Sequence, residues 1–215
     1  MSLFELIQAQ QDRIIEVTLG HLQITLVVIA VATLVGVGLG MATYQRPRWA
    51  SLVLGITGIF LTIPSFALFG IFIPILGLGF KPAFVALLMY ALLPIVRNTI
   101  VGLHAVDAAV VDAARGMGVN RSRILLRIEL PLAWPVIITG MRVSTMLVVG
   151  IAAIASFVNG PGLGFYIFRG LSTIGGANAF NFVIIGTVGI VLLGLLLDGA
   201  FLLLGKLTTP RGIRA

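Results

Sequence analysis

Three charged side chains interrupt stretches of sequence that are otherwise strongly apolar. Arg97, Arg142 and Asp198 each lie inside a hydrophobic run long enough to cross a bilayer. A charge in hydrocarbon is expensive unless it is paired or hydrated, so such residues commonly mark pathways. We predict that Asp198 pairs with Arg142 or Arg97 and ties spans together near an inner gate. The alternative is that the arginines extend separately to the membrane interface.

The two histidines are the other residues that could take part in catalysis or bind a metal. His21 and His104 are far apart in the sequence, and neither has acidic or histidine partners at the spacing of a metal site. A serine nucleophile needs a base nearby, and neither histidine is expected to reach one inside the membrane. The chain has no cysteine, which excludes disulfides and thiolate chemistry. We therefore expect no catalytic residue and no metal site, with both histidines at the interface.

A nucleotide-binding loop is also missing from the sequence. Gly205-Lys206 is followed by leucine and has no glycine at the spacing that a phosphate-binding loop requires. Any ATP is therefore expected to bind to a different chain.

The composition is that of a membrane protein. Of the 215 residues, 59% are apolar and 10% are charged, and the mean hydropathy is +1.16. A helix of about twenty residues crosses the hydrocarbon core, and apolar runs of that length recur along the chain. Pro64 and Pro74 break the overlong second run, which predicts a kink or a partial re-entry near Pro64. We predict a single all-α integral membrane domain over residues 1–215, with five spans at 22–43, 50–75, 83–103, 135–157 and 181–205.

Basic residues predict how these spans are oriented. We assign the formal charge of +7 to orientation and partner contact rather than to nucleic acid. One side of the membrane receives Arg46, Arg48, Arg115, Arg121, Arg123, Arg127, Lys206, Arg211 and Arg214, and the other receives Arg13, Lys81 and Arg169. Because cytoplasmic loops carry the excess of Lys and Arg, we predict the N-terminus outside and the C-terminus inside. On this topology Arg97, Arg142 and Asp198 lie about one to two turns from the cytoplasmic ends of their spans.

The first span and the segment before it have distinct patterns. Residues 1–21 mix charged and amide side chains with apolar ones and lack the basic head of a cleaved signal peptide. We expect this segment to lie at the membrane interface. In the first span, Ala32, Gly36 and Gly40 put small residues on one face, where another helix can approach closely. Alternatively, these glycines reflect only how common glycine is in membrane helices.

Residues 104–134, between the third and fourth spans, are too polar to remain in lipid. Alanines favour a helix in the first half of this loop, and Asp112 and Arg115 are spaced to interact across one turn. The glycines at 116 and 118 are expected to end that helix, because glycine tolerates left-handed backbone. Asn120 or Ser122 can cap a second helix that runs toward Pro131. We predict a helix, a tight turn and a second helix.

The second of these helices is amphipathic. Ile124 and Ile128 share one face, while Arg123 and Arg127 share another. Such a helix suits docking onto another protein. A basic loop lying on anionic lipid is the alternative, but charge alone does not explain the glycine or the Leu-Pro pair in this segment.

The run DAARGMGVNRSRILLRIELP in this loop resembles the EAA loop of binding-protein-dependent ABC importer permeases. The residues at the spacing of that motif are Asp112, Ala113, Ala114, Gly118, Ile128, Leu130 and Pro131. Asp112 stands where the family usually has glutamate, which keeps the charge on a shorter arm. The resemblance implies a type I importer (MetI-like) permease fold. It also implies a coupling helix that sits in a groove of a cytoplasmic ATPase subunit, with ATP-Mg on that partner and no cofactor on this chain.

A narrower resemblance to osmoprotectant permeases covers Ile63-Pro64-Ser65, the loop and the run from Asn159 to Gly164. It implies import of glycine betaine, carnitine or choline in a bacterial inner membrane, with methionine permeases as the nearest rival. Recognition of the solute would fall to an external binding protein that meets the 158–180 loop. Contact candidates there are Phe157, Asn159, Tyr166 and Phe168, although an ordinary glycine-rich connection explains any one of them equally well.

The expected partners are therefore cytoplasmic ATP-binding subunits, a second permease copy or a homologous permease, the external binding protein and the bilayer. No nucleic acid is expected. A different class of protein, a passive channel or a membrane scaffold whose loop binds a cytoplasmic protein, remains open from the sequence.

Overall fold

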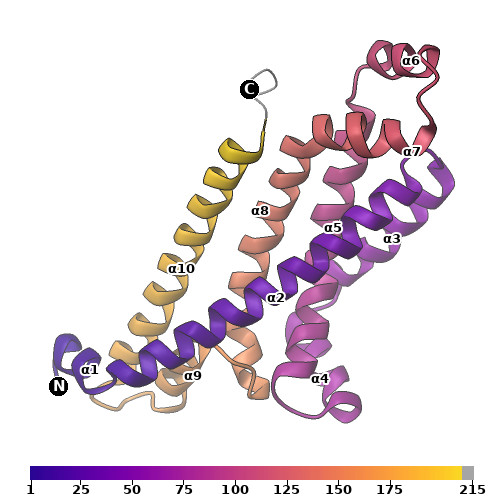
Figure 1. The fold of residues 1–215 in the computed structure, drawn as a ribbon. Helices are drawn as coiled ribbons and strands as arrows, with labels where there is room; N and C mark the ends of the chain where they lie inside the picture. The colour runs from indigo at the N-terminus through magenta and orange to yellow at the C-terminus, as the bar shows by residue number, and fades with distance from the viewer. Residues whose placement is uncertain (210–215) are drawn as a thin grey trace.

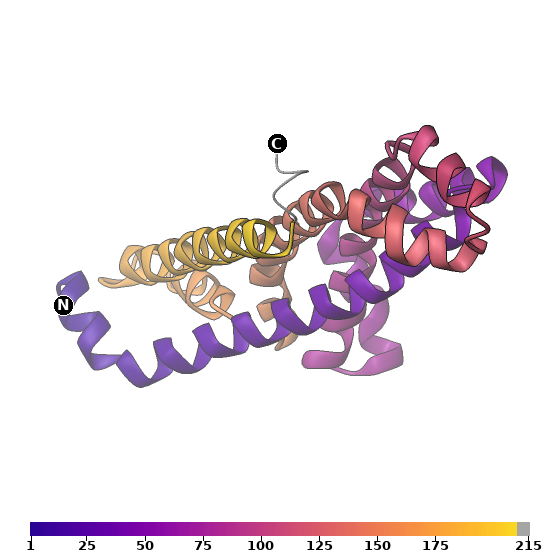
Figure 2. The same cartoon turned by 45° about the horizontal axis from the view of Figure 1, so that its top comes forward.

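The computed structural model describes residues 1–209, in which every regular element is a helix. Four helical segments are long and apolar enough to cross a membrane, and Figures 1 and 2 show them as an inclined bundle. They are α2 (Gln11–Thr43), α5 (Phe80–His104), a continuous segment Arg121–Val158 that contains α8 (Leu130–Ala155), and α10 (Ala179–Thr208). A bent pair of shorter helices makes a fifth span if the pair is counted as one. The predicted all-α membrane fold is therefore confirmed.

The bent pair occupies the region where the second span was expected, at 50–75. α3 (Pro47–Thr62) and α4 (Ser65–Leu76) meet at an angle of 98°. Pro64 lies at the break and, having no backbone N–H, it cannot continue the hydrogen bonding of α3. The predicted break near Pro64 is therefore present, and α3 alone spans only about 24 Å.

The N-terminal segment 1–21 is largely helical and joins the first span directly. Ser2 and Glu5 cap α1 (Leu3–Ala9) reciprocally, and the chain turns at Gln10. α2 then begins at Gln11, well before the boundary predicted at residue 22. Leu6 and Val17 are buried with residues of α9 (Gly164–Ser172) and α10, so this segment packs on the bundle.

α5 is the central helix of the bundle and packs between α2 and α8. Small residues of α2 make the close approach possible. A Cβ atom added at Gly36 would lie 2.8 Å from Cγ2 of Ile95, and Gly40 is as tightly packed against Thr99. The stripe that contains Ala32, which is fully buried, is therefore a packing surface.

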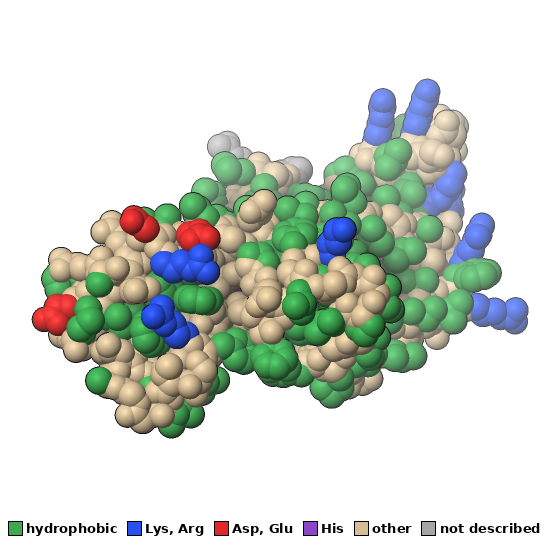
Figure 3. All heavy atoms as spheres, turned by 90° about the horizontal axis from the view of Figure 1, so that it is seen from below, with side chains coloured by type: hydrophobic (Ala, Val, Ile, Leu, Met, Phe, Trp, Pro, Cys, Tyr) green, Lys and Arg blue, Asp and Glu red, His purple; other side chains and the backbone are tan. Residues whose placement is uncertain are grey.

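The two ends of the bundle differ in what they carry (Figure 1). The loop end bears α6 (Ala108–Gly116), α7 (Arg121–Ile124) and the end of α10. The far end bears α1, α4 and α9, so the described N-terminal and C-terminal helices finish at opposite ends. Arg211 and Arg214, which contributed to the charge count, lie outside the described residues. Viewed from the far end, the acidic side chains in sight lie on the left with basic side chains beside them, and further basic side chains lie near the centre and on the right (Figure 3).

Candidate functional site

The segment 105–129 at the loop end has the predicted helix–turn–helix form. The Asp107 side chain caps α6 by accepting from the backbone N–H of Ala109. α6 ends at Gly116, and Gly118 takes the left-handed backbone with φ of +78°. The Asn120 side chain then caps α7 by accepting from the N–H of Arg123. Local capping and one left-handed glycine therefore build the turn.

The motif residues divide between an exposed edge and a small core. Asp112 is exposed and pairs with Arg115 at 3.1 Å, as its spacing predicted. Ala113, Gly118 and Pro131 are also exposed. The remaining motif residues are turned inward or half-buried, and they are Ala114, Ile128 and Leu130.

A cluster of apolar side chains, the loop core, joins α6 to the second helix. Its buried members are Val111 and Ala114 from α6 and Ile124 from α7, with Ile128 packed against them. The apolar face predicted for the second helix therefore packs against α6 within the loop. Its basic residues Arg123 and Arg127 are exposed at the loop end, along with Leu126 and Met117.

The second helix, which was predicted to run toward Pro131, continues past this proline without a break. α7 continues through a π-helical turn, Leu125–Glu129, directly into α8. The N–H of Leu130 bonds to the carbonyl of Leu125, one residue beyond the usual α-helical partner. This widened turn precedes Pro131, which has no N–H to donate, and it keeps the helix continuous. Motion of the loop can thus pass directly into a span.

A buried polar network at the loop end was not predicted. Glu129 is 4% exposed and accepts a hydrogen bond of 2.7 Å from the Tyr44 hydroxyl, in the connection between α2 and α3. Arg121 donates to the same carboxylate at 3.0 Å, and its guanidinium lies 5.6 Å from the centre of the Tyr44 ring. Nε2 of His104, the last residue of α5, lies 2.7 Å from the Tyr44 carbonyl oxygen. Nothing local in the sequence links Tyr44 to Glu129, because the contact depends on tertiary packing.

The structure pairs Asp198 with Arg142. Two hydrogen bonds of 2.9 Å, from Nε and Nη2 of Arg142, bind the carboxylate and connect α8 to α10. Arg97 is exposed and makes no ion pair with any residue in 1–209, so it is the arginine that stays separate. The pair lies deeper than expected, about three turns from the helix ends at the loop end, because α8 begins before residue 135.

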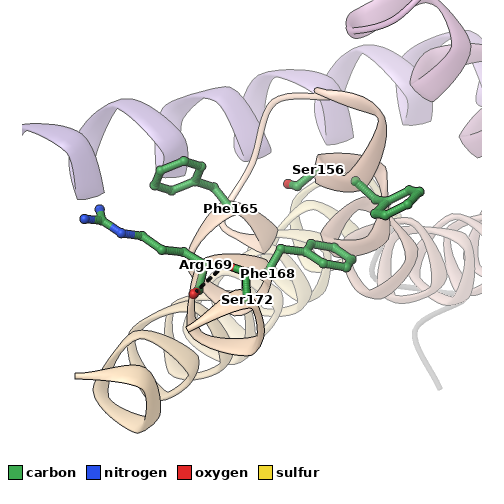
Figure 4. A pocket seen from close by; sticks show the side chains of 6 residues that line it. Ser156, Phe165, Phe168, Arg169 and Ser172 are labelled. Atoms are coloured by element: carbon green, nitrogen blue, oxygen red, sulfur yellow. Dashed lines mark hydrogen bonds between the residues drawn. The ribbon is translucent and has the colours of Figure 1, made fainter. Parts of the chain in front are cut away.

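The far end carries a cluster of aromatic rings. Phe157 is 61% exposed, and its ring lies 5.1 Å from that of Phe66 and 5.7 Å from that of Phe168. Phe157 lines a groove of about 560 Å³, in which Phe168 lies on one side and Phe165 and Arg169 lie on the other (Figure 4). An adjoining groove of about 620 Å³ includes Asn159, whose backbone is left-handed at φ of +59°.

Tyr166 does not belong to this exposed surface. The side chain is fully buried, stacks on Phe182 and packs edge-on against Phe165. Burial raises the pKa of its hydroxyl, and the positive charges of Arg169 and Arg13 oppose that rise. Tyr166 is therefore a packing residue, and Phe157, Asn159 and Phe168 are the candidates left accessible. The 158–180 segment around them is itself ordered by α9 and by the short 3-10 helix Ser156–Val158.

His21 is buried, contrary to the interfacial position expected for it. Its Nδ1 accepts a hydrogen bond of 3.2 Å from the N–H of Leu163, and its Nε2 lies 3.1 Å from the Val149 carbonyl oxygen. The ring thus ties α2 to α8 and to the start of α9. His104 is exposed, and its contact with the Tyr44 carbonyl lies at the loop end. Within residues 1–209 no group of three or more His, Asp or Glu residues could hold a metal ion.

A family model described as "Binding-protein-dependent transport system inner membrane component" matches residues 32–209. The chain belongs to this family, and it is therefore a multi-pass protein of the bacterial plasma membrane and the permease subunit of an ABC importer. Such permeases are not enzymes themselves, and the family works with ATP-binding subunits and substrate-binding proteins.

Curated relatives extend over nearly the whole chain. The choline transport system permease protein OpuBB of Bacillus subtilis (strain 168) is 35% identical over 98% of this chain and 95% of its own length. The glycine betaine/carnitine/choline permease OpuCB of the same strain is 37% identical, covering 90% and 88%. The osmoprotectant import permease OsmW of Salmonella typhimurium is 36% identical, covering 92% of each chain. The predicted membership of the osmoprotectant group is thus confirmed.

Among solved structures, a chain of the MetNI methionine ABC transporter in an inward-facing conformation has the same fold. The TM-score is 0.80 at 25% identity, over 92% of this chain and 96% of that one. The predicted MetI-like fold is therefore confirmed.

Proposed function

We propose that this permease imports a small osmoprotectant, namely glycine betaine, carnitine or choline. The observation that carries the proposal is the set of relatives named for these solutes, at 35% to 37% identity over at least 90% of the chain. Methionine is the second candidate, favoured only by the fold of the methionine transporter, for which the identity is lower.

Transport is driven by ATP-Mg bound and hydrolysed on separate ATP-binding subunits that dock at the loop end. The exposed edge of α6, with Asp112 and Ala113, and the left-handed turn at Gly118 supply the contact surface. Ile128 packs against the loop core and so supports α6. Leu130 and Pro131 come directly after the π-helical turn, at the start of α8. With the loop end in the cytoplasm, the N-terminus lies outside, the C-terminus inside, and residues 1–21 near the outer interface.

Alternating access requires a second permease, either another copy of this chain or a homologous one. The Arg142–Asp198 pair ties α8 to α10 near the inner gate, which opens and closes as the permease changes between outward-open and inward-open states. Both side chains are about one-third exposed (32% and 31%), and a charged pair at this depth needs water or protein beside it rather than lipid.

An external binding protein delivers the solute to the far end. The grooves beside α9 suit this contact, because exposed aromatic rings with neighbouring charges are typical of binding hot spots. Phe157 and Phe168 supply the rings, Asn159 an exposed amide, and Arg13, paired with Glu16 at 2.6 Å, a charged margin.

The test is uptake by proteoliposomes that contain the permease, its ATP-binding subunit and its binding protein. Labelled glycine betaine, carnitine, choline and methionine are supplied with and without enclosed ATP. We expect ATP-dependent accumulation of at least one osmoprotectant and none of methionine. Accumulation of methionine alone would show that methionine, and not an osmoprotectant, is the substrate. Flux of all four solutes without ATP would indicate a passive channel.

A further inference from the structure

The buried network at the loop end connects three parts of the chain that are distant in sequence. Tyr44 belongs to the connection between α2 and α3, and His104 is the last residue of α5. Arg121 and Glu129 are the first and last residues of the segment made of α7 and the π-helical turn. In Figure 1, α7 lies between α6 and the turn that joins α2 to α3.

The Glu129 carboxylate is the centre of this network. A buried carboxylate is stable only when hydrogen bonds and an opposite charge replace its lost hydration. The Tyr44 hydroxyl supplies one bond at 2.7 Å, and Arg121 supplies the charge, with Nη2 2.9 Å from Oε2. Because both donors converge on one buried acid, this junction resists separation more than an exposed ion pair would.

α6 reaches this junction through the loop core. Val111 and Ala114 of α6 pack on Ile124, which lies in the same short helix as Arg121. A displacement of α6 is therefore passed first to α7 by apolar packing, and then to the α2–α3 connection through Glu129 and Tyr44. The continuous helix from α7 into α8 does not itself connect the loop to α2 or α3. Among the described residues, the Tyr44–Glu129 hydrogen bond is the polar contact that does so, and His104 of α5 also contacts Tyr44.

We infer that Glu129, Arg121 and Tyr44 are positioning residues for energy coupling: they hold the docking loop to the α2–α3 connection, so that movement of α6 also moves α2 and α3. The inference rests on the proposed function, since it requires an ATPase that pushes on α6. It assigns Tyr44 and Glu129 neither to the ATPase contact nor to the solute pathway, because both are buried within the chain.

The test uses Tyr44→Phe and Glu129→Gln in the complete complex reconstituted in proteoliposomes. The first variant keeps the ring under Arg121 and removes only the hydroxyl, and the second keeps the shape of Glu129 and removes its charge. Ser144→Ala is the matched control, because it deletes a buried hydrogen bond of 2.6 Å from α8 to the Ala91 carbonyl of α5, away from the loop. The measurements are the melting temperature, the amount of co-purified ATP-binding subunit, ATP hydrolysis and solute uptake.

For both loop-end variants we expect complete assembly and retained ATP hydrolysis, with solute transported per ATP reduced about fivefold, as loss of a charged buried hydrogen bond implies. The double variant should be no worse than the more severe single one, because both break the same junction. Ser144→Ala should keep the wild-type ratio. Wild-type ratios in both loop-end variants, or an equal fall in Ser144→Ala, would overturn the inference. Absence of ATP-driven uptake by the wild-type complex would instead overturn the proposed function.

Discussion

Arg142 and Asp198 form a two-bond ion pair that links α8 to α10, with both hydrogen bonds at 2.9 Å. The planar guanidinium matches the two oxygens of the carboxylate, which a lysine at this position could not do. The sequence predicted that Asp198 would take an arginine but left two choices. Arg97 and Arg142 both lie in apolar runs, and only the packing of α8 against α10 distinguishes them.

Reversal of either charge in this pair is expected to abolish transport. Arg142→Asp places two acids together, and Asp198→Arg places two cations together, in surroundings where an unpaired charge is destabilising by about 3–5 kcal/mol. The double reversal restores opposite charges and should recover part of the uptake and of the melting temperature. Arg97→Ala serves as the comparison and should leave the melting temperature nearly unchanged. Failure of the double reversal to improve on either single variant would argue against the pairing.

Gly118 is expected to be needed for its backbone conformation. Its φ of +78° disfavours any residue with a Cβ, although an added Cβ would meet no heavy atom within 4 Å in the described structure. Gly118→Ala should therefore lower the stability of the loop by about 1 kcal/mol and weaken retention of the ATP-binding subunit. Gly116→Ala is the matched control, since its Cβ also has open space but its backbone is helical. The two variants are compared by co-purification, and an equal effect of both would contradict this explanation.

Much of the loop end could be predicted because its turns are encoded locally. Asp107 and Asn120 are capping residues at the right positions, and glycine permits the left-handed turn between the helices. The continuation of the second helix through Pro131 could not be foreseen, because proline usually ends a helix and a π-helical turn has no simple sequence pattern. The contact of Tyr44 with Glu129 joins residues 85 positions apart, so only the fold brings them together.

The small-residue stripe of α2 gives a prediction about helix packing. Gly40→Ala would force a methyl group against Thr99 of α5, whereas Gly38→Ala adds one where the described structure leaves space. We expect Gly40→Ala to destabilise the permease by about 1–3 kcal/mol and Gly38→Ala to be neutral. Thermal unfolding in detergent measures both. A stable Gly40→Ala protein would mean that α2 and α5 are less closely packed than described.

The outline of the bundle followed from hydropathy, while the details at its ends did not. Length and apolar content were enough to locate α5 and α10 within a few residues of their bounds. The 98° bend between α3 and α4 could be anticipated only as a break at Pro64, because its angle is set by packing. His21 and Tyr166 looked accessible by position, yet both are buried by the way α1, α2 and α9 pack together.

The aromatic cluster at the far end is expected to contribute to contact with the binding protein. Phe157→Ala should raise the concentration of loaded binding protein required for half-maximal ATP-driven uptake by about tenfold, as truncation of an aromatic hot-spot residue does. Ile174→Ala is the control, because Ile174 is a still more exposed apolar residue of the same end that does not line the groove. Equal half-maximal concentrations for Phe157→Ala and wild type would remove this cluster from the proposed contact.

The most direct test of the role of the loop uses the absence of cysteine from the chain. A single cysteine at Met117, which is 76% exposed between α6 and α7, can be crosslinked in the assembled complex without interference from other thiols of the permease. Ile174→Cys, at a position 80% exposed on the far end, is the matched control. We expect a crosslink to the ATP-binding subunit from position 117 but not from position 174. A crosslink from 174 alone, or from neither position in a complex that hydrolyses ATP, would contradict docking of the ATPase at this loop.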